Sequence, residues 1–303
     1  MMFTKFQDIF AELAGRGAKK RMIAAWAVDG HTIAAASKAV DLGIVEATLV
    51  GDEALIKAEC ANQGIDMGKF KIVHNPSELP AVAEAVTMVN QGEGDILMKG
   101  LCSTDKFMRA ILNKETGLLP PKAVLSHCAV VENPNYHKLL FIGDMAVIPA
   151  PDLTQKVAIL NYLVNTARAM GIEKPKVAII AATEQMLYKM PACVEAAIIA
   201  KMVDRGQIRN CIADGPLALD VAIDQEAVEI KHVVSPVAGD ADCLVFPNIE
   251  SANVFYKCNS KLASNVKQAG MVVGAKVPCV LSSRADSIDT KLNSIAIAAM
   301  SAR

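Results

Sequence analysis

The sequence predicts an α/β protein in which helices cover mainly parallel sheets. Hydrophobic residues make up 52% of the 303 residues and aromatic residues only 4%, so the apolar side chains are mostly aliphatic. Aliphatic runs of this kind are typical of parallel strands that are buried on both faces. Short aliphatic runs also alternate with longer helical patterns along the chain, as expected for right-handed βαβ units. High hydrophobicity and a net charge of −1 together exclude an intrinsically disordered chain.

The first part of the chain alternates regularly between the two patterns. Gly43 closes the first predicted helix, and Ser103 stands at the N-cap of a later one. The predicted strands are 22–28, 47–50, 71–74 and 95–98, and the predicted helices are 30–42, 54–62, 79–90 and 104–112.

The second part continues the alternation after a segment rich in proline. Pro134, Pro149 and Pro151 lie around Asp144, which ends a strand, and we interpret this segment as the crossing between two α/β lobes. A further strand is expected after Cys128. The other predicted strands are 139–142, 177–182, 210–213, 242–246 and 278–281, and the predicted helices are 153–170, 192–205, 249–266 and 286–300.

Charge and cysteine usage exclude several classes of protein. With 31 basic and 32 acidic residues, one Trp and four Tyr, the chain lacks the basic excess and stacking side chains of a nucleic-acid-binding protein. The eight cysteines include no C-x-x-C pair and predict reduced, buried thiols. We find no signal peptide and no run long enough to span a membrane, and therefore expect a cytoplasmic protein. P-loop and dinucleotide fingerprints are also absent from the sequence.

The clearest candidate site follows the last predicted strand, in the segment Leu281–Ser287. Ser283, Arg284 and Asp286 would stand at the start of a helix, where free N–H groups and a guanidinium suit phosphate or another compact anion. The alternative is an ordinary helix start, with a serine as N-cap and Asp286 in the first turn.

A second candidate site follows the strand at 95–98. Lys99 and Gly100 form the turn, Ser103 and Thr104 begin the next helix, and Arg109 lies further along it. Such a loop can bind phosphate, although an ordinary turn with a serine cap fits the same pattern.

Weaker candidates also lie near predicted strand ends. A lone histidine is more often a core residue than a ligand contact, and Asp-Gly-Pro is a common turn sequence. These candidates are Ser126, His127, Asp144, Asp214, Asn253 and Lys257.

In order and spacing, these segments resemble the phosphate acetyl/butyryltransferase family over nearly the whole chain. The resemblance is closest to the butyryltransferase branch, whose MKGLxST segment is similar to Met98–Thr104. The other segments that resemble family blocks are Leu125–His127, Lys189–Ala192, Asp214–Asp220, Ser235–Gly239, Asn253–Lys257 and Leu281–Ser287.

The resemblance implies two lobes of the isocitrate/isopropylmalate dehydrogenase type, with the active site in the cleft between them. Because the C-terminal helix of the family returns to the first lobe, we expect lobes of 1–143 with 278–303 and of 144–277. It also implies a homodimer or an assembly of dimers. The implied reaction converts a short-chain acyl-CoA and phosphate reversibly to acyl phosphate and CoA, with butyryl-CoA preferred and acetyl-CoA as the alternative. CoA is then a substrate, and no metal or other cofactor is expected.

By the same resemblance, Ser283 would stabilise the thiolate or the oxyanion, Arg284 would hold phosphate, and Arg109 is a second phosphate candidate. Acetyltransferase relatives have an aspartate where this chain has Thr290. The expected base is therefore one of three other carboxylates, namely Asp286, Asp289 and Asp144.

Two other functions use the same fold. A metal-dependent decarboxylating dehydrogenase would need an aspartate cluster and a nucleotide site, and we identify neither in the sequence. A sensor that binds CoA or acyl phosphate without catalysis would not need the Ser283–Arg284 pair.

Overall fold

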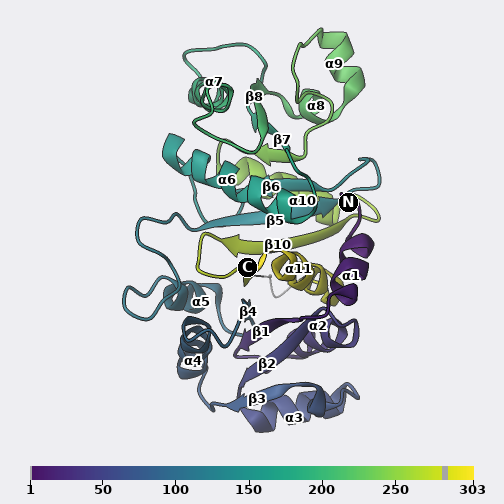
Figure 1. Ribbon diagram of the computed structural model, residues 1–303, viewed down its shortest axis with the longest axis vertical. Coiled ribbons are helices and arrows are strands. Elements are labelled where there is room, and N and C mark those ends of the chain that lie inside the picture. The colour runs from purple at the N-terminus through teal and green to yellow at the C-terminus, as the bar shows by residue number, and fades with distance from the viewer. Residues whose placement is uncertain (1, 282–285) are drawn as a thin grey trace. The chain divides into compact units, whose positions relative to one another are not determined.

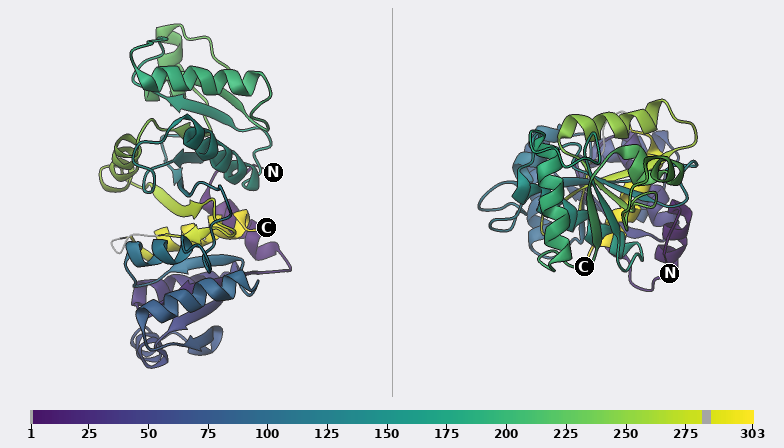
Figure 2. Two further views of the ribbon diagram at one scale, coloured as in Figure 1. Left: turned by 90° about the vertical axis from the view of Figure 1, so that its left-hand side faces the viewer. Right: turned by 90° about the horizontal axis from the view of Figure 1, so that it is seen from above.

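The structure, a computed structural model, describes residues 2–281 and 286–303 (Figure 1). The chain forms two compact units. We call the unit made of Phe6–Leu125 and Ala269–Arg303 the terminal unit. The central unit contains Ser126–Gln268 and the described residues up to Lys5. Both units are built from strands flanked by helices (Figure 2), so the predicted α/β class is confirmed.

The strands of the terminal unit lie in the order β3-β2-β1-β4-β11-β10. Neighbouring strands are parallel, as in the register Met22↔Ala47 between β1 and β2, except that β10 runs antiparallel to β11. The carboxyl ends of β1, β2, β3, β4 and β11 therefore share one edge of the sheet. The strand bounds are β1 Lys20–Ala25, β2 Val45–Gly51, β3 Lys71–His74, β4 Ile96–Lys99, β10 Lys267–Val273 and β11 Cys279–Val280.

Several helices of the terminal unit begin at side-chain caps that satisfy free N–H groups. Asp29 caps α2, Asp52 caps α3, Ser103 caps α5 and Ser287 caps α11. The helix bounds are α1 Phe6–Gly15, α2 Gly30–Asp41, α3 Glu53–Asn62, α4 Glu78–Asn90, α5 Thr104–Ile111 and α11 Ile288–Ser301, with a 3₁₀ turn at Met67–Lys69.

The central unit orders its strands β5-β6-β9-β7-β8, and only β5 is antiparallel to its neighbour. Ile142 and Leu244 face a core that is completed by Ala252 and Phe255 of α10, so α10 covers that face of the sheet. The bounds are β5 Ser126–Glu132, β6 Leu140–Gly143, β7 Lys176–Ile180, β8 Ile212–Leu217, β9 Cys243–Val245, α6 Leu153–Ala169, α7 Pro191–Asp204, α8 Leu219–Ile223, α9 Gln225–Lys231 and α10 Ile249–Lys261.

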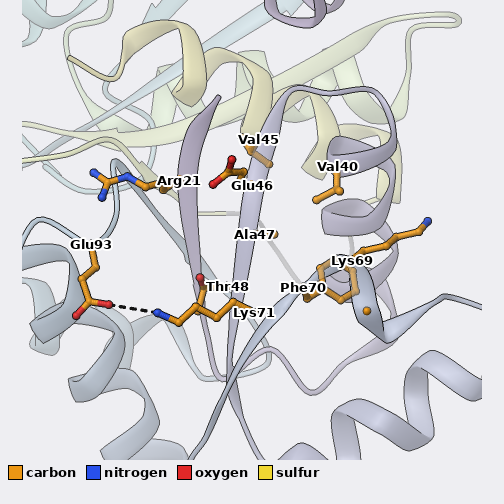
Figure 3. Close-up of a pocket in the computed structure, with 11 residues that line it drawn as sticks. Arg21, Val40, Val45, Glu46, Ala47, Thr48, Lys69, Phe70, Lys71 and Glu93 are labelled. Atoms are coloured by element: carbon orange, nitrogen blue, oxygen red, sulfur yellow. Dashed lines mark ion pairs between the residues drawn. The ribbon is translucent and has the colours of Figure 1, made fainter. Parts of the chain in front are cut away.

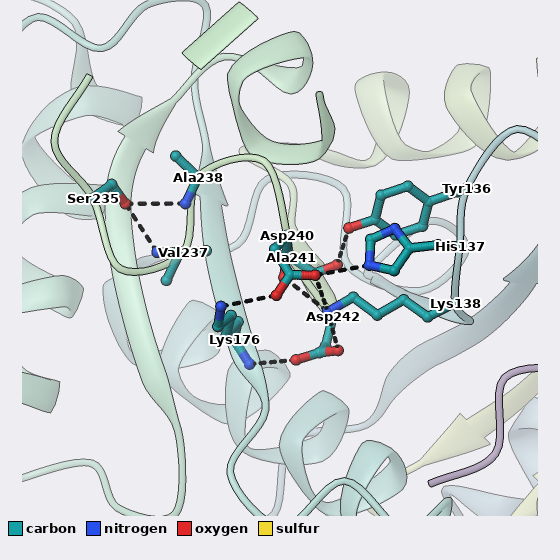
Figure 4. Close-up of polar contacts among 10 residues, drawn as sticks. All are labelled: Tyr136, His137, Lys138, Lys176, Ser235, Val237, Ala238, Asp240, Ala241 and Asp242. Carbon is teal, nitrogen blue, oxygen red and sulfur yellow. Dashed lines mark hydrogen bonds and ion pairs between the residues drawn. The ribbon is translucent and has the colours of Figure 1, made fainter. Parts of the chain in front are cut away.

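A cluster of charged side chains joins the amino ends of β6, β7 and β9 (Figure 4). Lys138 is 6% exposed, and its Nζ lies 2.8 Å from Asp240 and 2.7 Å from Asp242. Lys176 also lies 2.8 Å from Asp240. Burial acts to raise the pKa of the Asp240 carboxyl, but the hydrogen bonds from Lys138 and Lys176 outweigh it, so the pKa lies below its usual range. The cluster fixes the segment that leads into β9.

The unit boundaries differ from the predicted ones. A boundary after residue 143 would place β5 and β6 in the first lobe, whereas the structure has both strands in the central unit. The two strands pair with each other, as in Val131↔Leu140, and β6 pairs with β9. A boundary at 277/278 would separate β10 from β11, yet these strands are paired through Met271↔Val280. Both differences involve strand pairs, β5 with β6 and β10 with β11, which a local pattern does not reveal.

Candidate functional site

Lys99 closes the turn between β4 and α5. It ends β4 and is 3% exposed, and its Nζ donates to the carbonyl oxygens of Gly100 at 3.1 Å and Cys102 at 2.8 Å. The predicted ligand-binding lysine therefore holds the backbone of its own turn, and its charge lies buried at the carboxyl edge of the sheet.

Gly100 is required by the close approach of a neighbouring strand end. Its N–H donates to the carbonyl oxygen of Ala25 at 2.9 Å. A Cβ at this position would lie 2.2 Å from the carbonyl oxygen of Trp26, far inside any real contact. Only glycine fits here, which keeps the turn after β4 tight against the end of β1.

The start of α5 has a side-chain cap and an ion pair within the helix. Ser103 Oγ accepts the N–H of Lys106 at 3.3 Å as the N-cap, and Thr104 is the first helical residue. Arg109 is 79% exposed and pairs with Asp105 on the same helix at 3.0 Å. These contacts match the ordinary-turn alternative, and they leave the predicted phosphate contacts of Ser103, Thr104 and Arg109 as predictions.

The start of α11 carries two of the predicted carboxylates. Ser283 and Arg284 lie outside the described residues. Asp286 is half-buried, whereas Asp289 is 78% exposed and lies 3.2 Å from Lys38 of α2. Of the two carboxylates, Asp286 is thus the one that is shielded from solvent.

Lys291 is a buried residue that the sequence reasoning missed. It is the fourth residue of α11 and is only 4% exposed. Burial lowers the pKa of its ammonium, and repulsion from Lys99 lowers it further, whereas Asp29 and Asp286 act in the opposite direction. One feature of the sequence could have indicated its burial. Lys291 stands shortly before the run SIAIAAM, Ser294–Met300, whose small and apolar residues are typical of a buried helix.

In the central unit, Asp144 binds two predicted site residues. Its Oδ2 accepts the hydroxyl of Ser126 at 2.9 Å and the backbone N–H groups of His127 and Ile148, both at 3.2 Å. Its Oδ1 accepts two more backbone N–H groups, from Ala146 at 2.8 Å and Val147 at 2.9 Å. A carboxylate has about four lone-pair positions, and five donors occupy them. Asp144 therefore fixes the β6–α6 connection, which does not favour a role as base.

The remaining predicted residues of the central unit lie on different elements. Asn253 of α10 donates to the carbonyl oxygen of Met145 at 3.0 Å and so lies beside the Asp144 cluster. Lys257 is exposed one turn later on α10. Asp214 lies on β8, which β9 and β7 separate from β6, and accepts the N–H of Gly215 at 2.8 Å. The structure thus groups Ser126, His127, Asp144 and Asn253 but leaves Asp214 apart.

A cavity of about 620 Å³ lies elsewhere in the terminal unit (Figure 3). Its lining residues Arg21, Glu46 and Lys71 stand at the amino ends of β1, β2 and β3, and Lys71 pairs with Glu93 at 3.5 Å. None of the predicted site residues lines it. Ligands of open α/β sheets bind at the opposite, carboxyl edge, so we do not assign the active site to this cavity.

The described parts of the chain contain neither a metal-binding cluster nor a membrane-spanning helix. Within residues 2–281 and 286–303, no three His, Cys, Asp or Glu side chains are grouped so that they could hold a metal ion. None of the described helices has the length and apolar character to cross a membrane.

Known sequences provide independent support for the predicted family. The family model for phosphate acetyl/butaryl transferase matches residues 5–84 and 78–299. A phosphate butyryltransferase of Clostridium acetobutylicum is 44% identical over 99% of this chain and 98% of its own length. A phosphate acetyltransferase of Thermotoga maritima is 41% identical over 97% of this chain and 99% of its own length.

Solved structures agree with the sequence matches. A branched-chain phosphotransacylase from Enterococcus faecalis V583 superposes with a TM-score of 0.81 at 30% identity, over 93% of this chain and 98% of the other. A 4-hydroxythreonine-4-phosphate dehydrogenase from Klebsiella pneumoniae gives 0.60 at 9% identity, over 94% of this chain and 100% of the other, a likeness of fold alone. The dehydrogenase alternative is therefore not favoured, and the predictions of a transferase and of its family are confirmed. This chain belongs to the phosphate acetyl/butaryl transferase family.

Proposed function

We propose that this protein reversibly transfers a short acyl group between coenzyme A and inorganic phosphate, with butyryl-CoA as the preferred donor. The observation that carries the proposal is the pair of buried lysine side chains, Lys99 and Lys291, at the carboxyl edge of the terminal sheet. The N-termini of α2 and α5 follow strands β1 and β4 at the same edge and add partial positive charge. Phosphate and the oxyanion of the acyl-transfer intermediate both need such surroundings.

The preference for butyryl-CoA over acetyl-CoA rests on the segment Met98–Thr104, which is similar to the butyryltransferase branch. Each methylene contributes only about 1–3 kcal/mol to discrimination and butyryl has two more than acetyl, so acetyl-CoA is the expected second, slower substrate. Butyryl-CoA, isobutyryl-CoA and acetyl-CoA should be compared by kcat/KM.

The direct assay follows free thiol after mixing the purified protein with butyryl-CoA and phosphate. We expect release that requires phosphate, and Arg284→Gln should reduce it strongly because the proposed phosphate contact is lost. Release without phosphate would indicate a thioesterase. A folded protein that releases no thiol from any of the three substrates would contradict the proposed function, and an unaffected Arg284→Gln variant would contradict the site.

The proposed reaction uses no metal. It also uses no organic cofactor, because CoA is itself a substrate. Dialysis against EDTA should leave the phosphate-dependent rate unchanged, whereas a loss that Mg²⁺ or Mn²⁺ restores would contradict this part.

We further propose a cytoplasmic homodimer. Light scattering coupled to size-exclusion chromatography tests the dimer through a mass twice that of one chain.

A further inference from the structure

Lys291 occupies an unusual position for a lysine. Every residue of α11 from Lys291 to Met300 is buried, and the helix packs against α2, β4 and β11. Lys291 is the charged residue of this run, and its neighbours Asn293 and Ser294 are the other strongly polar ones. An ammonium buried in such a helix is costly unless charges near it compensate.

The charged groups near Lys291 come from three elements. Asp29 caps α2, Asp286 precedes α11, and Lys99 ends β4. On α1, which also packs against α11, Asp8 and Glu12 are exposed, and β11 contributes the buried thiol of Cys279. Two carboxylates and two lysine side chains therefore share the carboxyl edge of the terminal sheet.

Asp29 has capacity for a further hydrogen bond. Its Oδ1 accepts the N–H of Thr32 at 3.0 Å as the cap of α2. Its Oδ2 and the Thr32 hydroxyl are buried, and neither has a hydrogen-bond partner among the described residues. Buried polar atoms without partners are rare and often mark a functional position. This polar edge is suited to hold a group that changes its protonation state.

The reaction needs such a group, because the attacking phosphate hydroxyl loses a proton and the CoA sulfur gains one. Two of the three predicted carboxylate bases are poorly placed for this. Asp144 is occupied by five donors, and Asp289 is exposed and paired with Lys38. Burial and Lys99 lower the pKa of Lys291, so its neutral amine is more accessible than that of an exposed lysine.

We propose that Lys291 is a further catalytic residue, which carries the proton between phosphate and the CoA sulfur; this inference rests on the proposed function. In the direction of acyl phosphate synthesis, the neutral amine accepts the proton of the phosphate hydroxyl as the O–C bond forms. The C–S bond then breaks, and the Lys291 ammonium gives the same proton to the thiolate. Lysine returns to its neutral form, and no further reactant is needed.

The test replaces Lys291 by arginine, which keeps a buried cation but cannot lose its proton. We expect kcat to fall by roughly 100-fold or more, as for the loss of an acid–base group, with KM for butyryl-CoA little changed. The wild-type kcat/KM should rise with pH as Lys291 deprotonates, and this rise should be missing in Lys291→Arg. Lys156→Arg is the matched control, because Lys156 is 5% exposed in the central unit and pairs with Glu195.

A second variant covers the case in which arginine does not fit. Lys291→Ala should be inactive but should regain turnover when small primary amines are added, which a purely structural role would not allow. A Lys291→Arg variant with the wild-type rate and pH profile, or a folded Lys291→Ala variant without rescue, would overturn the inference. If the wild type itself shows no phosphate-dependent thiol release, the proposed function fails instead.

Discussion

Asp144 is the candidate base whose surroundings the structure describes in most detail. Because five donors converge on its two oxygens, replacing it by asparagine would turn an NH₂ group toward N–H donors. We expect Asp144→Asn to lower the free energy of unfolding by roughly 1–3 kcal/mol, the usual cost of unsatisfied buried polar groups. Urea denaturation measures this change.

The same variant separates a structural role from a catalytic one. If Asp144 were the base, Asp144→Asn would lower kcat and leave the urea midpoint unchanged. The contacts predict the reverse, a lower midpoint with kcat retained in the folded fraction. Ser126→Ala is a useful partner because it removes one of the five donors and should have a smaller effect in the same direction.

Single residues also show the limit of the sequence reasoning. Asp144, Ser126, His127 and Asn253 were predicted separately from strand ends, and the structure brings them together. Lys291 was missed because a lysine near a helix start is normally solvated, and its burial depends on the sheet and helices that surround α11. Local patterns carry no information on that packing.

At the scale of elements, the β4–α5 turn depends on Gly100. A methyl group there would lie 2.2 Å from the carbonyl oxygen of Trp26 and 2.8 Å from that of Ala25, so the backbone must move. We expect Gly100→Ala to cost roughly 1–3 kcal/mol of stability, as other overpacked substitutions do, and to lower kcat by displacing Lys99. Thermal unfolding and the thiol-release assay measure the two effects.

Gly17→Ala is the matched control for this substitution. A Cβ at Gly17 has no heavy atom within 4 Å, so stability and turnover should both stay near the wild-type values. Equal effects of the two substitutions would show that Gly100 has no special role in the turn.

Elements with a strong local pattern were predicted well. Strands β1, β2, β3, β4 and β11 of the terminal unit lie close to their predicted ranges, and the caps at Asp29 and Asp52 start helices near the predicted positions. The helix predicted at 249–266 ends earlier, at Lys261, and β10 was not predicted. Asn265 adopts a left-handed φ of 60°, and the Ser264-Asn265 pair is a turn signal that could have corrected this prediction.

At the scale of the whole molecule, the division of the chain depends on pairs of strands that are distant in sequence. Cys279 of β11 pairs with Leu97 of β4, so the C-terminal segment joins the first strands of the chain. Such pairing was expected only through the family resemblance. The boundary at Ser126 could not be found locally, because β5 contributes a hydrophobic run that fits either unit.

The burial of the thiols is a property of the whole fold and can be tested directly. Seven of the eight cysteines are buried and Cys258 is exposed. Burial raises the pKa of Cys102 and Cys211 to about 11, and that of Cys128 and Cys279 to about 12, so these thiols stay protonated at neutral pH.

We expect one thiol per native chain to react quickly with a colorimetric reagent at pH 8, and all eight to react in guanidinium chloride. Cys258→Ser should abolish the fast reaction and the background that it adds to the CoA assay. Several fast thiols in the native wild type would show that one of the two units opens readily in solution.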